Sequence, residues 1–385
     1  MADGQNKSVY VSRVETYDAK IIKSELKTAL DALGVDLSAF AEKKVVIKPN
    51  LIIKKAPDGA ATTHPAVIDA VLSLCEDAGV RPTIAESPGG VYSTAHLEAS
   101  YRVCGIDAVA KAHDCVLNTG TSSEKMTYPD GRSEKTFDII KPIVDADVII
   151  DVCKLKSHSL TKMSAAAKNL YGTVPGIIKF ELHAKFPDIV GFSSMLCDLD
   201  QMLIGSKTVI AITDGIVGME GEGPTGGSPK KIGALLVSRD PFSSDVIAAE
   251  ILGLGVDGVP LLKEAASRGL IPDSADGIET LGADAKELVV HDFVLPRSQT
   301  IPALNFFSTG KMGKIMAPRP VITDKCRGCG ECVRSCPQKT ITLKNGRAKI
   351  DRKKCIRCFC CQELCPFVAI KTHRNPILTI VNNIK

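Results

Sequence analysis

Short apolar runs alternate with amphipathic segments from residue 9 to residue 295 of this chain. Runs rich in β-branched residues predict strands, and segments that open at a capping residue or proline predict helices. Strands are expected at 45–52, 82–86, 116–120, 147–152, 207–214 and 232–237. Helices are expected at 65–79, 164–172, 241–252 and 260–268, with Thr63 as N-cap of the first. The alternation predicts an α/β domain whose sheet is at least partly parallel.

The end of the chain departs from this alternation because it carries a repeated cysteine pattern. The two runs are Cys326-x2-Cys329-x2-Cys332-x3-Cys336-Pro337 and Cys355-x2-Cys358-x2-Cys361-x3-Cys365-Pro366. Tight C-x2-C-x2-C turns let three thiolates converge on one metal cube. A structural zinc site usually takes four ligands from two C-x2-C pairs, so zinc fits this pattern less well. Disulfides need a secreted, oxidising context, which the sequence does not indicate.

The repeated run resembles that of the two-cluster bacterial ferredoxins. In those proteins three cysteines of one run and the fourth of the other bind one [4Fe–4S] cluster. The resemblance implies two [4Fe–4S] clusters. Their ligands would be Cys326, Cys329, Cys332 and Cys365 for the first cluster, and Cys355, Cys358, Cys361 and Cys336 for the second. Cys360 lies inside the second run without changing its spacing, and we expect it not to be a ligand.

Length and composition limit the class of protein. The 385 residues leave room for about two or three domains. No apolar run is long enough for a transmembrane helix, and the polar start at 1–7 predicts no secretory signal. Fourteen cysteines in such a chain indicate a reducing, cytoplasmic and anaerobic setting.

Three segments are expected: an α/β domain at 1–295, a proline-punctuated linker at 296–320, and a small α+β ferredoxin domain with a tail at 321–385. The net charge of +4 hides an asymmetry, because 18 of the 48 Lys and Arg but only 4 of the 44 Asp and Glu follow residue 296. This basic excess offsets anionic clusters, steers an acidic partner or faces the acidic N-terminal part. Nucleic-acid binding is not expected, since aromatic residues do not interleave with the basic ones.

Polar residues gather where the predicted strands end, which is where ligands bind in α/β sheets. We expect an anionic substrate or cofactor to be bound by Lys48, Asn50, Thr63, Lys154, Lys156, Lys168 and Asn169. Lys154 and Lys156 would share one side of an extended segment. His64 and His158 are the candidate proton donors. The plainer alternative is that the lysines are solvated and the histidines are hydrogen-bonded structural residues.

A glycine-rich stretch, Gly221-x-Gly223-x-x-Gly226, matches the dinucleotide-binding pattern. Its context does not fit, because Pro224 interrupts it and a strand rather than a helix follows. We therefore interpret it as a flap over a ligand or as an irregular turn.

A second resemblance covers residues 9–255. It rests on five motifs: Val46-Ile47-Lys48-Pro49-Asn50-Leu51, Thr63-His64-Pro65, Lys154-x-Lys156-x-His158, Ala167-Lys168-Asn169-Leu170-Tyr171-Gly172, and Met219-Glu220-Gly221 followed by Gly223-Pro224. As a set these resemble the DUF362 family, whose function is unassigned and many of whose members carry a two-cluster ferredoxin module. A more distant similarity to the lactate racemase α/β fold implies a ligand cleft between two lobes. The nickel cofactor of that enzyme is not carried over, because no residue pattern supports it.

Three functions are compatible with these features. In an iron–sulfur oxidoreductase, the two clusters would relay electrons to the anion site of the α/β domain. In a non-catalytic electron-transfer protein, the α/β domain would dock a redox partner protein instead. A redox sensor is the third hypothesis, which the absence of a DNA-binding motif disfavours. Polar residues at strand ends favour the first, while the substrate, the oligomeric state, the direction of electron flow and a possible flavin or further metal stay open.

The cysteine pattern generates a prediction about metal content. Protein purified without oxygen should hold about eight iron atoms and about eight acid-labile sulfides per chain, as two cubane clusters require. Iron and sulfide assays measure both quantities. About four irons, or zinc in place of iron, would contradict the ferredoxin interpretation.

Overall fold

The computed structural model describes residues 7–296 and 318–373. Its larger part is an α/β domain built on a nine-stranded sheet in the order β11-β1-β10-β9-β7-β2-β3-β4, with β8 paired to β7. The run from β9 through β7, β2 and β3 to β4 is parallel, whereas β10 is antiparallel to both β9 and β1. The predicted α/β fold with a partly parallel sheet is confirmed. The expected linker at 296–320 lies largely outside the described residues, as does the part of the expected tail after residue 373.

The strands of the sheet are β1 (Val9–Arg13), β2 (Val45–Pro49), β3 (Thr83–Ile84), β4 (Val116–Leu117), β7 (Val148–His158), β8 (Lys162–Ser164), β9 (Thr208–Glu220), β10 (Ser228–Ser238) and β11 (Thr280–Gly282). A separate hairpin joins β5 (Ser123–Thr127) to β6 (Thr136–Ile140). β7 and β9 are longer than predicted. Lys154 and Lys156 therefore lie inside a fully buried strand rather than in the loop after it.

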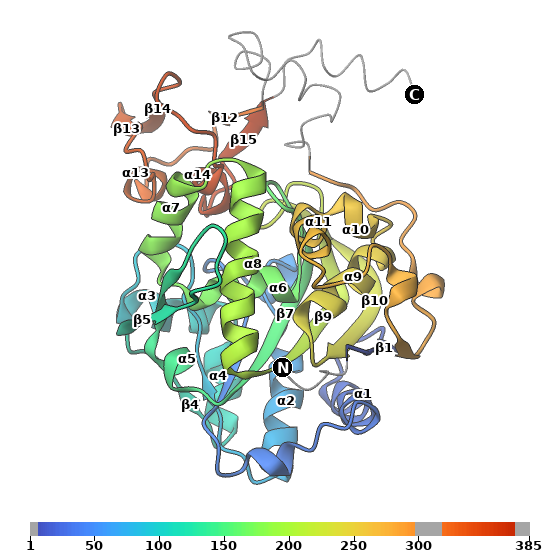
Figure 1. Ribbon diagram of the computed structural model, residues 1–385. Helices are drawn as coiled ribbons and strands as arrows, with labels where there is room; N and C mark the ends of the chain where they lie inside the picture. Colours follow the sequence, from blue (N-terminus) through green and yellow to red (C-terminus); the bar gives the residue numbers. More distant parts are fainter. Residues whose placement is uncertain (1–6, 297–317, 374–385) are drawn as a thin grey trace.

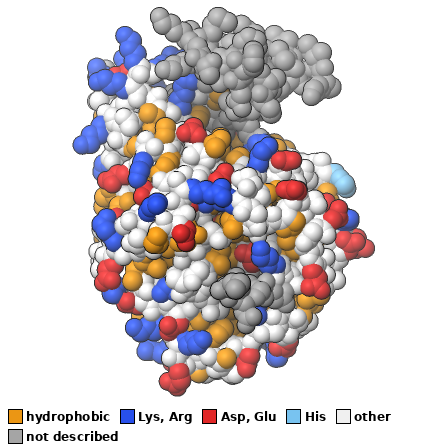
Figure 2. All heavy atoms as spheres, in the orientation of Figure 1, with side chains coloured by type: hydrophobic (Ala, Val, Ile, Leu, Met, Phe, Trp, Pro, Cys, Tyr) orange, Lys and Arg blue, Asp and Glu red, His pale blue; other side chains and the backbone are white. Residues whose placement is uncertain are grey.

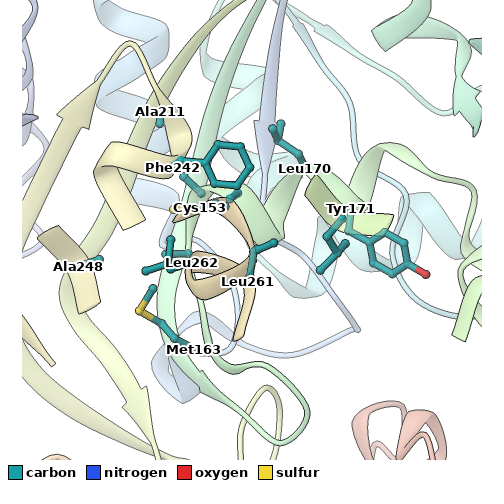
Figure 3. Packing of buried hydrophobic residues seen from close by; sticks show 14 of the residues in the cluster. Cys153, Met163, Leu170, Tyr171, Ala211, Phe242, Ala248, Leu261 and Leu262 are labelled. Atoms are coloured by element: carbon teal, nitrogen blue, oxygen red, sulfur yellow. The ribbon is translucent and has the colours of Figure 1, made fainter. Parts of the chain in front are cut away.

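Helices cover both faces of the sheet (Figure 1). One core packs α1 (Ala19–Ala32), α2 (Pro65–Asp77), α3 (Thr94–Val103) and α4 (Ile106–Ala112) against one face. The other core includes α5 (Lys141–Asp145), α6 (Ala166–Leu170), α8 (Ile189–Ser206), α9 (Pro241–Ile251), α10 (Gly255–Gly258) and α11 (Pro260–Ser267). Figure 3 shows Phe242, Leu261 and Leu262 gathered near Cys153 of β7 in this second core.

The start of α2 corrects one detail of the sequence analysis. The N-cap is His64, whose Nδ1 accepts a hydrogen bond from the backbone N–H of Ala66 at 3.2 Å. Thr63 instead bridges two strands, because its hydroxyl donates to the Val152 carbonyl at 2.6 Å and accepts from the Asn50 N–H at 2.8 Å. The threonine thus fixes the loop after β2 against β7.

The cysteine runs form a small module with two pairs of antiparallel strands. β12 (Arg319–Ile322) pairs with β15 (Ile370–His373), and β13 (Ile341–Lys344) pairs with β14 (Arg347–Ile350). The short helices α13 (Glu331–Arg334) and α14 (Cys360–Glu363) lie within the two runs. Left-handed backbone recurs at equivalent positions, at Gly328 and Gly330 in the first run and at Arg357 and Phe359 in the second. The two runs therefore fold alike.

The module sits against the α/β domain beside α7 (Gly176–Lys185) (Figure 1). An apolar cluster across the contact joins Ile53 and Phe180 to Cys360 and Leu364. The Thr225 hydroxyl of the glycine-rich stretch donates to the Glu363 carbonyl at 2.8 Å. This stretch, interpreted from sequence as a flap or a turn, thus packs on the ferredoxin-like module.

Candidate functional site at the interdomain cavity

A cavity of about 70 Å³ lies where the module meets the α/β domain. Its lining includes five of the sequence-predicted residues, namely Asn50, Lys156, His158, Lys168 and Asn169. Glu363 and Leu364 of the module line it as well. Sites for drug-sized ligands measure roughly 300–1,000 Å³. The cavity is therefore suited to a small group of atoms.

A directed chain of hydrogen bonds holds Lys156 in place. The Lys156 ammonium donates to the Asn50 amide oxygen and, at 2.6 Å, to the Ala61 carbonyl. The Asn50 amide nitrogen donates to Asn169 at 2.6 Å, and the Asn169 amide donates to the Asp151 carboxylate at 2.7 Å. Each side-chain amide that accepts a hydrogen bond in this series is thereby held in orientation by the hydrogen bond that it donates to the next residue. Lys156 itself faces only neutral oxygens, which leaves its charge uncompensated by direct pairing.

Lys168 brings a second positive charge to the cavity from α6. Its ammonium lies 4.8 Å from the ring centre of Tyr171 and 5.7 Å from that of Phe192. Within residues 7–296 and 318–373, Lys168 forms no ion pair or hydrogen bond. Burial lowers the pKa of Lys168, although Glu363 and Asp200 oppose this shift. An anion in the cavity would supply the missing partner.

His158 presents one ring nitrogen to the cavity. Its Nδ1 accepts hydrogen bonds from the backbone N–H groups of Leu160 at 3.1 Å and Thr161 at 3.3 Å. The neutral ring therefore carries its proton on Nε2, which lies 3.5 Å from Glu363. Burial, followed by the charges of Lys168 and Lys156, holds the pKa of His158 well below its usual value. His158 is thus a neutral hydrogen-bond donor.

Glu86 lines the cavity and is held from behind by a buried lysine. The buried Lys48 ammonium pairs with this carboxylate at 2.5 Å, and Lys48 does not line the cavity itself. Burial raises the pKa of Glu86, whereas Lys48 and Lys179 lower it. Gly172 packs against this pair so closely that a Cβ there would lie 2.4 Å from Glu86 Oε1. Only glycine fits at this position without displacing the pair.

The remaining predicted residues, Thr63, Lys154 and His64, also lie outside the cavity. Lys154 pairs with Asp214 at 2.6 Å and bonds to the Tyr17 hydroxyl at 2.9 Å. The His64 ring stacks on Tyr17 with 3.6 Å between ring centres. Lys154, which was expected to join Lys156 and Lys168 on one ligand, therefore does not line the cavity with them. The pairing of β7 with β9 shifts register between Lys154 and Lys156, which separates their environments.

Several residues that line the cavity were not predicted from the sequence. Lys179 and His183 lie one helical turn apart on α7, a helix that was not predicted. The Lys179 ammonium donates to the Ser87 carbonyl. Burial lowers the pKa of Lys179 to about 7 and, with Lys168 and Lys179 adding to the effect, that of His183 to about 3. The spacing of Lys179 and His183 within an amphipathic segment was the available signal.

A buried acid lies behind Lys168. Both carboxylate oxygens of Asp200 on α8 have no hydrogen-bond partner among the described residues. Burial, and then the neighbouring Asp245 and Asp151, raise the pKa of Asp200 well above its usual value. Burial and these neighbouring acids therefore favour the protonated form of Asp200, which weakens its compensation of the Lys168 charge.

The cysteines of the first predicted ligand set surround one small space. Cys326, Cys329, Cys332 and Cys365 together line a cavity of about 20 Å³. Backbone N–H groups point at two of these sulfurs, from Ala348 to Cys326 at 3.4 Å and from Ala369 to Cys365 at 3.3 Å. Such hydrogen bonds to sulfur tune the reduction potential of a bound cluster. The arrangement fits a cluster held by these four thiolates.

The second ligand set lies nearer the α/β domain. The thiol of Cys355 is close enough to Cys358 and Cys336 to be influenced by their charges, and Cys361 is close to all three. The N–H of Thr340 donates to the Cys336 sulfur at 3.3 Å, which repeats the Ala369–Cys365 contact of the first set. Cys360 packs in the apolar interdomain cluster instead.

The fold and the two cysteine sets define the class of protein: an iron–sulfur protein in which a ferredoxin module packs against an α/β domain. The sequence matches the domain of unknown function DUF362 over residues 45–250 and a 4Fe-4S dicluster domain over residues 320–366. The chain belongs to the DUF362 family. Iron–sulfur electron transfer follows from the dicluster match.

A thylakoid-associated protein of Synechocystis is 32% identical over 293 residues, which are 75% of this chain and 88% of that protein. A polyferredoxin-like protein of Methanocaldococcus jannaschii is 30% identical over 78 residues, 17% of this chain and 46% of its own length. A dihydromethanopterin reductase of Methanosarcina mazei is 36% identical over 77 residues, 19% of this chain and 31% of its own.

The lactate racemase apoprotein of Thermoanaerobacterium thermosaccharolyticum aligns with 64% of this chain and 58% of its own, at a TM-score of 0.38 and 16% identity. Across the described ranges, none of the helices combines the length and apolar character needed to cross a membrane.

Substitution of single cysteines tests the ligand sets. Cys326→Ser should damage the first cluster and Cys355→Ser the second, because each removes a thiolate ligand. Cys360→Ser should leave both intact, since this thiol packs against Ile53 and Phe180. Iron content and the electron paramagnetic resonance spectrum of the reduced protein measure the outcome. Loss of a cluster in Cys360→Ser would show that the second ligand set is assigned wrongly.

The burial of Lys156 generates a prediction about pH. Burial, and then Lys168 and Lys154, lower its pKa from 10.5 to about 7, while Glu86 opposes the shift. Between pH values of about 7 and 10.5, Lys156 is protonated in the unfolded chain and largely deprotonated in the folded protein. Because the unfolded state binds more protons in this range, the contribution of Lys156 to the free energy of unfolding rises with pH. Denaturant unfolding at several pH values should show a steeper rise in wild type than in Lys156→Met. Lys179 has a similar pKa in both proteins and cancels in the comparison. Equal slopes would contradict a buried, uncompensated Lys156.

Proposed function

We propose that this protein is an iron–sulfur oxidoreductase that exchanges electrons with a small anionic substrate bound in the interdomain cavity. One observation carries the proposal. The cavity is lined by Lys156 and Lys168 on one side and by Glu363 and Leu364 of the cysteine-bearing module on the other. Bound substrate would therefore lie beside the second predicted ligand set.

The charges of the cavity favour an anion. Lys156, Lys168 and Lys179 contribute three ammonium groups, against the carboxylates of Glu86 and Glu363. Glu86 is already engaged by Lys48 at 2.5 Å. A substrate with a carboxylate or phosphate group would relieve both the mutual repulsion and the burial penalty of the lysines.

Proton transfer would accompany electron transfer. Iron–sulfur clusters supply electrons one at a time, so a substrate that gains two electrons draws on two reduced clusters or on one cluster reduced twice. Lys156 supplies a proton, because a group with a pKa of about 7 is an efficient general acid near neutral pH. His158, whose pKa is held well below its usual value, offers its Nε2–H as a hydrogen-bond donor to the substrate and not as a proton source. His64, the other predicted proton donor, does not line the cavity.

The relatives support this proposal to different extents. The reductase relative matches over 19% of this chain, which supports electron transfer and not a shared substrate. The thylakoid-associated relative spans most of the chain, but its printed name states no reaction. An anion site in the α/β domain rests on the geometry of the cavity alone.

A screen of small anions tests the proposal. Carboxylates and phosphates that bind should raise the unfolding temperature of the wild-type protein, since a ligand that binds only the folded state stabilises it. Lys156→Ala should lose most of that stabilisation and keep its iron content. Lys20→Ala, which changes an exposed lysine of α1, serves as the control.

The same anions should alter the electron paramagnetic resonance spectrum of the reduced wild-type protein, because they would bind beside the second cluster. Equal thermal shifts in wild type and Lys156→Ala for every anion would refute the cavity as a binding site. An electron-transfer protein whose α/β domain docks a partner would then be the better interpretation.

A further inference from the structure

A second basic feature lies on the outside of the ferredoxin module. A broad groove of about 810 Å³ runs along β12 and the β13–β14 hairpin. It is lined by six cationic side chains and a single acid: Lys339, Lys344, Lys349, Arg352, Lys353 and Lys354, with Asp351. The six cations are exposed, and the groove shares no lining residue with the interdomain cavity.

The positive charge of this groove is uncompensated. None of its six cations forms an ion pair within the part of the chain that the structure describes. Surface lysines of the α/β domain are paired in many places, for example Lys27 with Asp31 at 3.0 Å and Lys111 with Asp107 at 2.8 Å. Figure 2 shows Lys and Arg gathered at the upper left of the molecule, where Figure 1 places β13 and β14. Like charges held together at one site favour an anionic partner.

The groove also lies directly over the predicted cluster ligands. Lys354 immediately precedes Cys355, and Lys339 is three residues after Cys336. Two lining residues, Ala348 and Thr340, donate their N–H groups to Cys326 and Cys336. A partner seated in the groove would therefore approach ligands of both clusters.

We propose that this groove docks an acidic one-electron carrier protein. In each encounter the carrier loses one electron, one cluster gains it, and no bond is made or broken. Charge complementarity would accelerate association, as it does between oppositely charged proteins. The proposal rests on the iron–sulfur role of the module and not on the interdomain cavity.

Two other anionic partners fit the groove less well. Single-stranded nucleic acid is held by aromatic platforms as well as by charge, and no aromatic side chain among the described residues lines the groove. A membrane surface is bound through inserted apolar residues. Leu343 and Phe367 are the most exposed large apolar residues of the described part of the module, and neither lines the groove.

An acidic flavodoxin is a suitable probe for the experiment. Oxidised flavodoxin is titrated with the full-length, cluster-loaded protein by calorimetry, and its hydroquinone is mixed with the protein in an anaerobic stopped-flow instrument. Wild type should bind and be reduced more slowly as salt increases, because salt screens the charges. The double variant Lys349→Glu with Lys353→Glu should lower the association rate at low salt by about tenfold.

A matched double variant controls for net charge. Lys20→Glu with Lys43→Glu makes the same change at exposed lysines of the α/β domain and should leave the rate within about twofold of wild type. Photoreduced deazaflavin, a small reductant that needs no docking, should reduce all variants equally. The groove variant should keep the anion-induced rise in unfolding temperature of wild type, so failure of the anion site and failure of the groove are distinguishable.

Three results would overturn the proposal. The first is equal flavodoxin kinetics in the groove variant and in wild type. The second is a wild-type reduction rate that does not depend on salt. This measurement uses the wild-type protein alone, so it tests the proposal even if the double variant loses its clusters. The third is loss of binding to phosphatidylglycerol vesicles in the groove variant with unchanged flavodoxin kinetics, which would identify a membrane-binding surface instead.

Discussion

The burial of lysine ammonium groups at one edge of the sheet is the constraint on which the site depends. Lys48, Lys154 and Lys156 are all almost completely removed from solvent. A buried charge without a partner is costly. Lys48 is paired with Glu86 and Lys154 with Asp214. Lys156 is met only by an amide and a carbonyl oxygen, so of these three lysines it is the one whose charge depends most on a ligand.

Placement of the ferredoxin module depends on small residues in the loops beneath it. A Cβ at Gly89 would lie 2.5 Å from Leu364, and one at Gly226 would lie 3.2 Å from Val368. Glycine at both positions lets the module approach closely enough for Glu363 to reach the cavity. The glycine-rich stretch that resembles a dinucleotide loop therefore has a packing role here, which explains why proline is tolerated within it.

The sequence revealed features that depend on local spacing and missed those that depend on distant contacts. Ligand spacing identified the cysteine module, and apolar runs identified most of the sheet. Lys179 was missed because its contact with Ser87 joins segments 92 residues apart. Separation of Lys154 from Lys156 could not be foreseen either, since it follows from a register shift between β7 and β9. Glu363 was missed because only the packing of the ferredoxin module against the α/β domain brings it to the cavity.

The distribution of charge links the two basic features of the molecule. Between residues 318 and 373 there are 13 Lys and Arg against 4 Asp and Glu. Positive charge around a cluster favours its reduced, more negative state, and the outward part of the same charge would attract an acidic carrier. A negative charge arriving beside the cavity would in turn favour the protonated form of Lys156. Under the proposed function, each electron would thereby bring a proton toward the substrate, because the lysine that binds the anion is also the one whose pKa is poised near neutral pH.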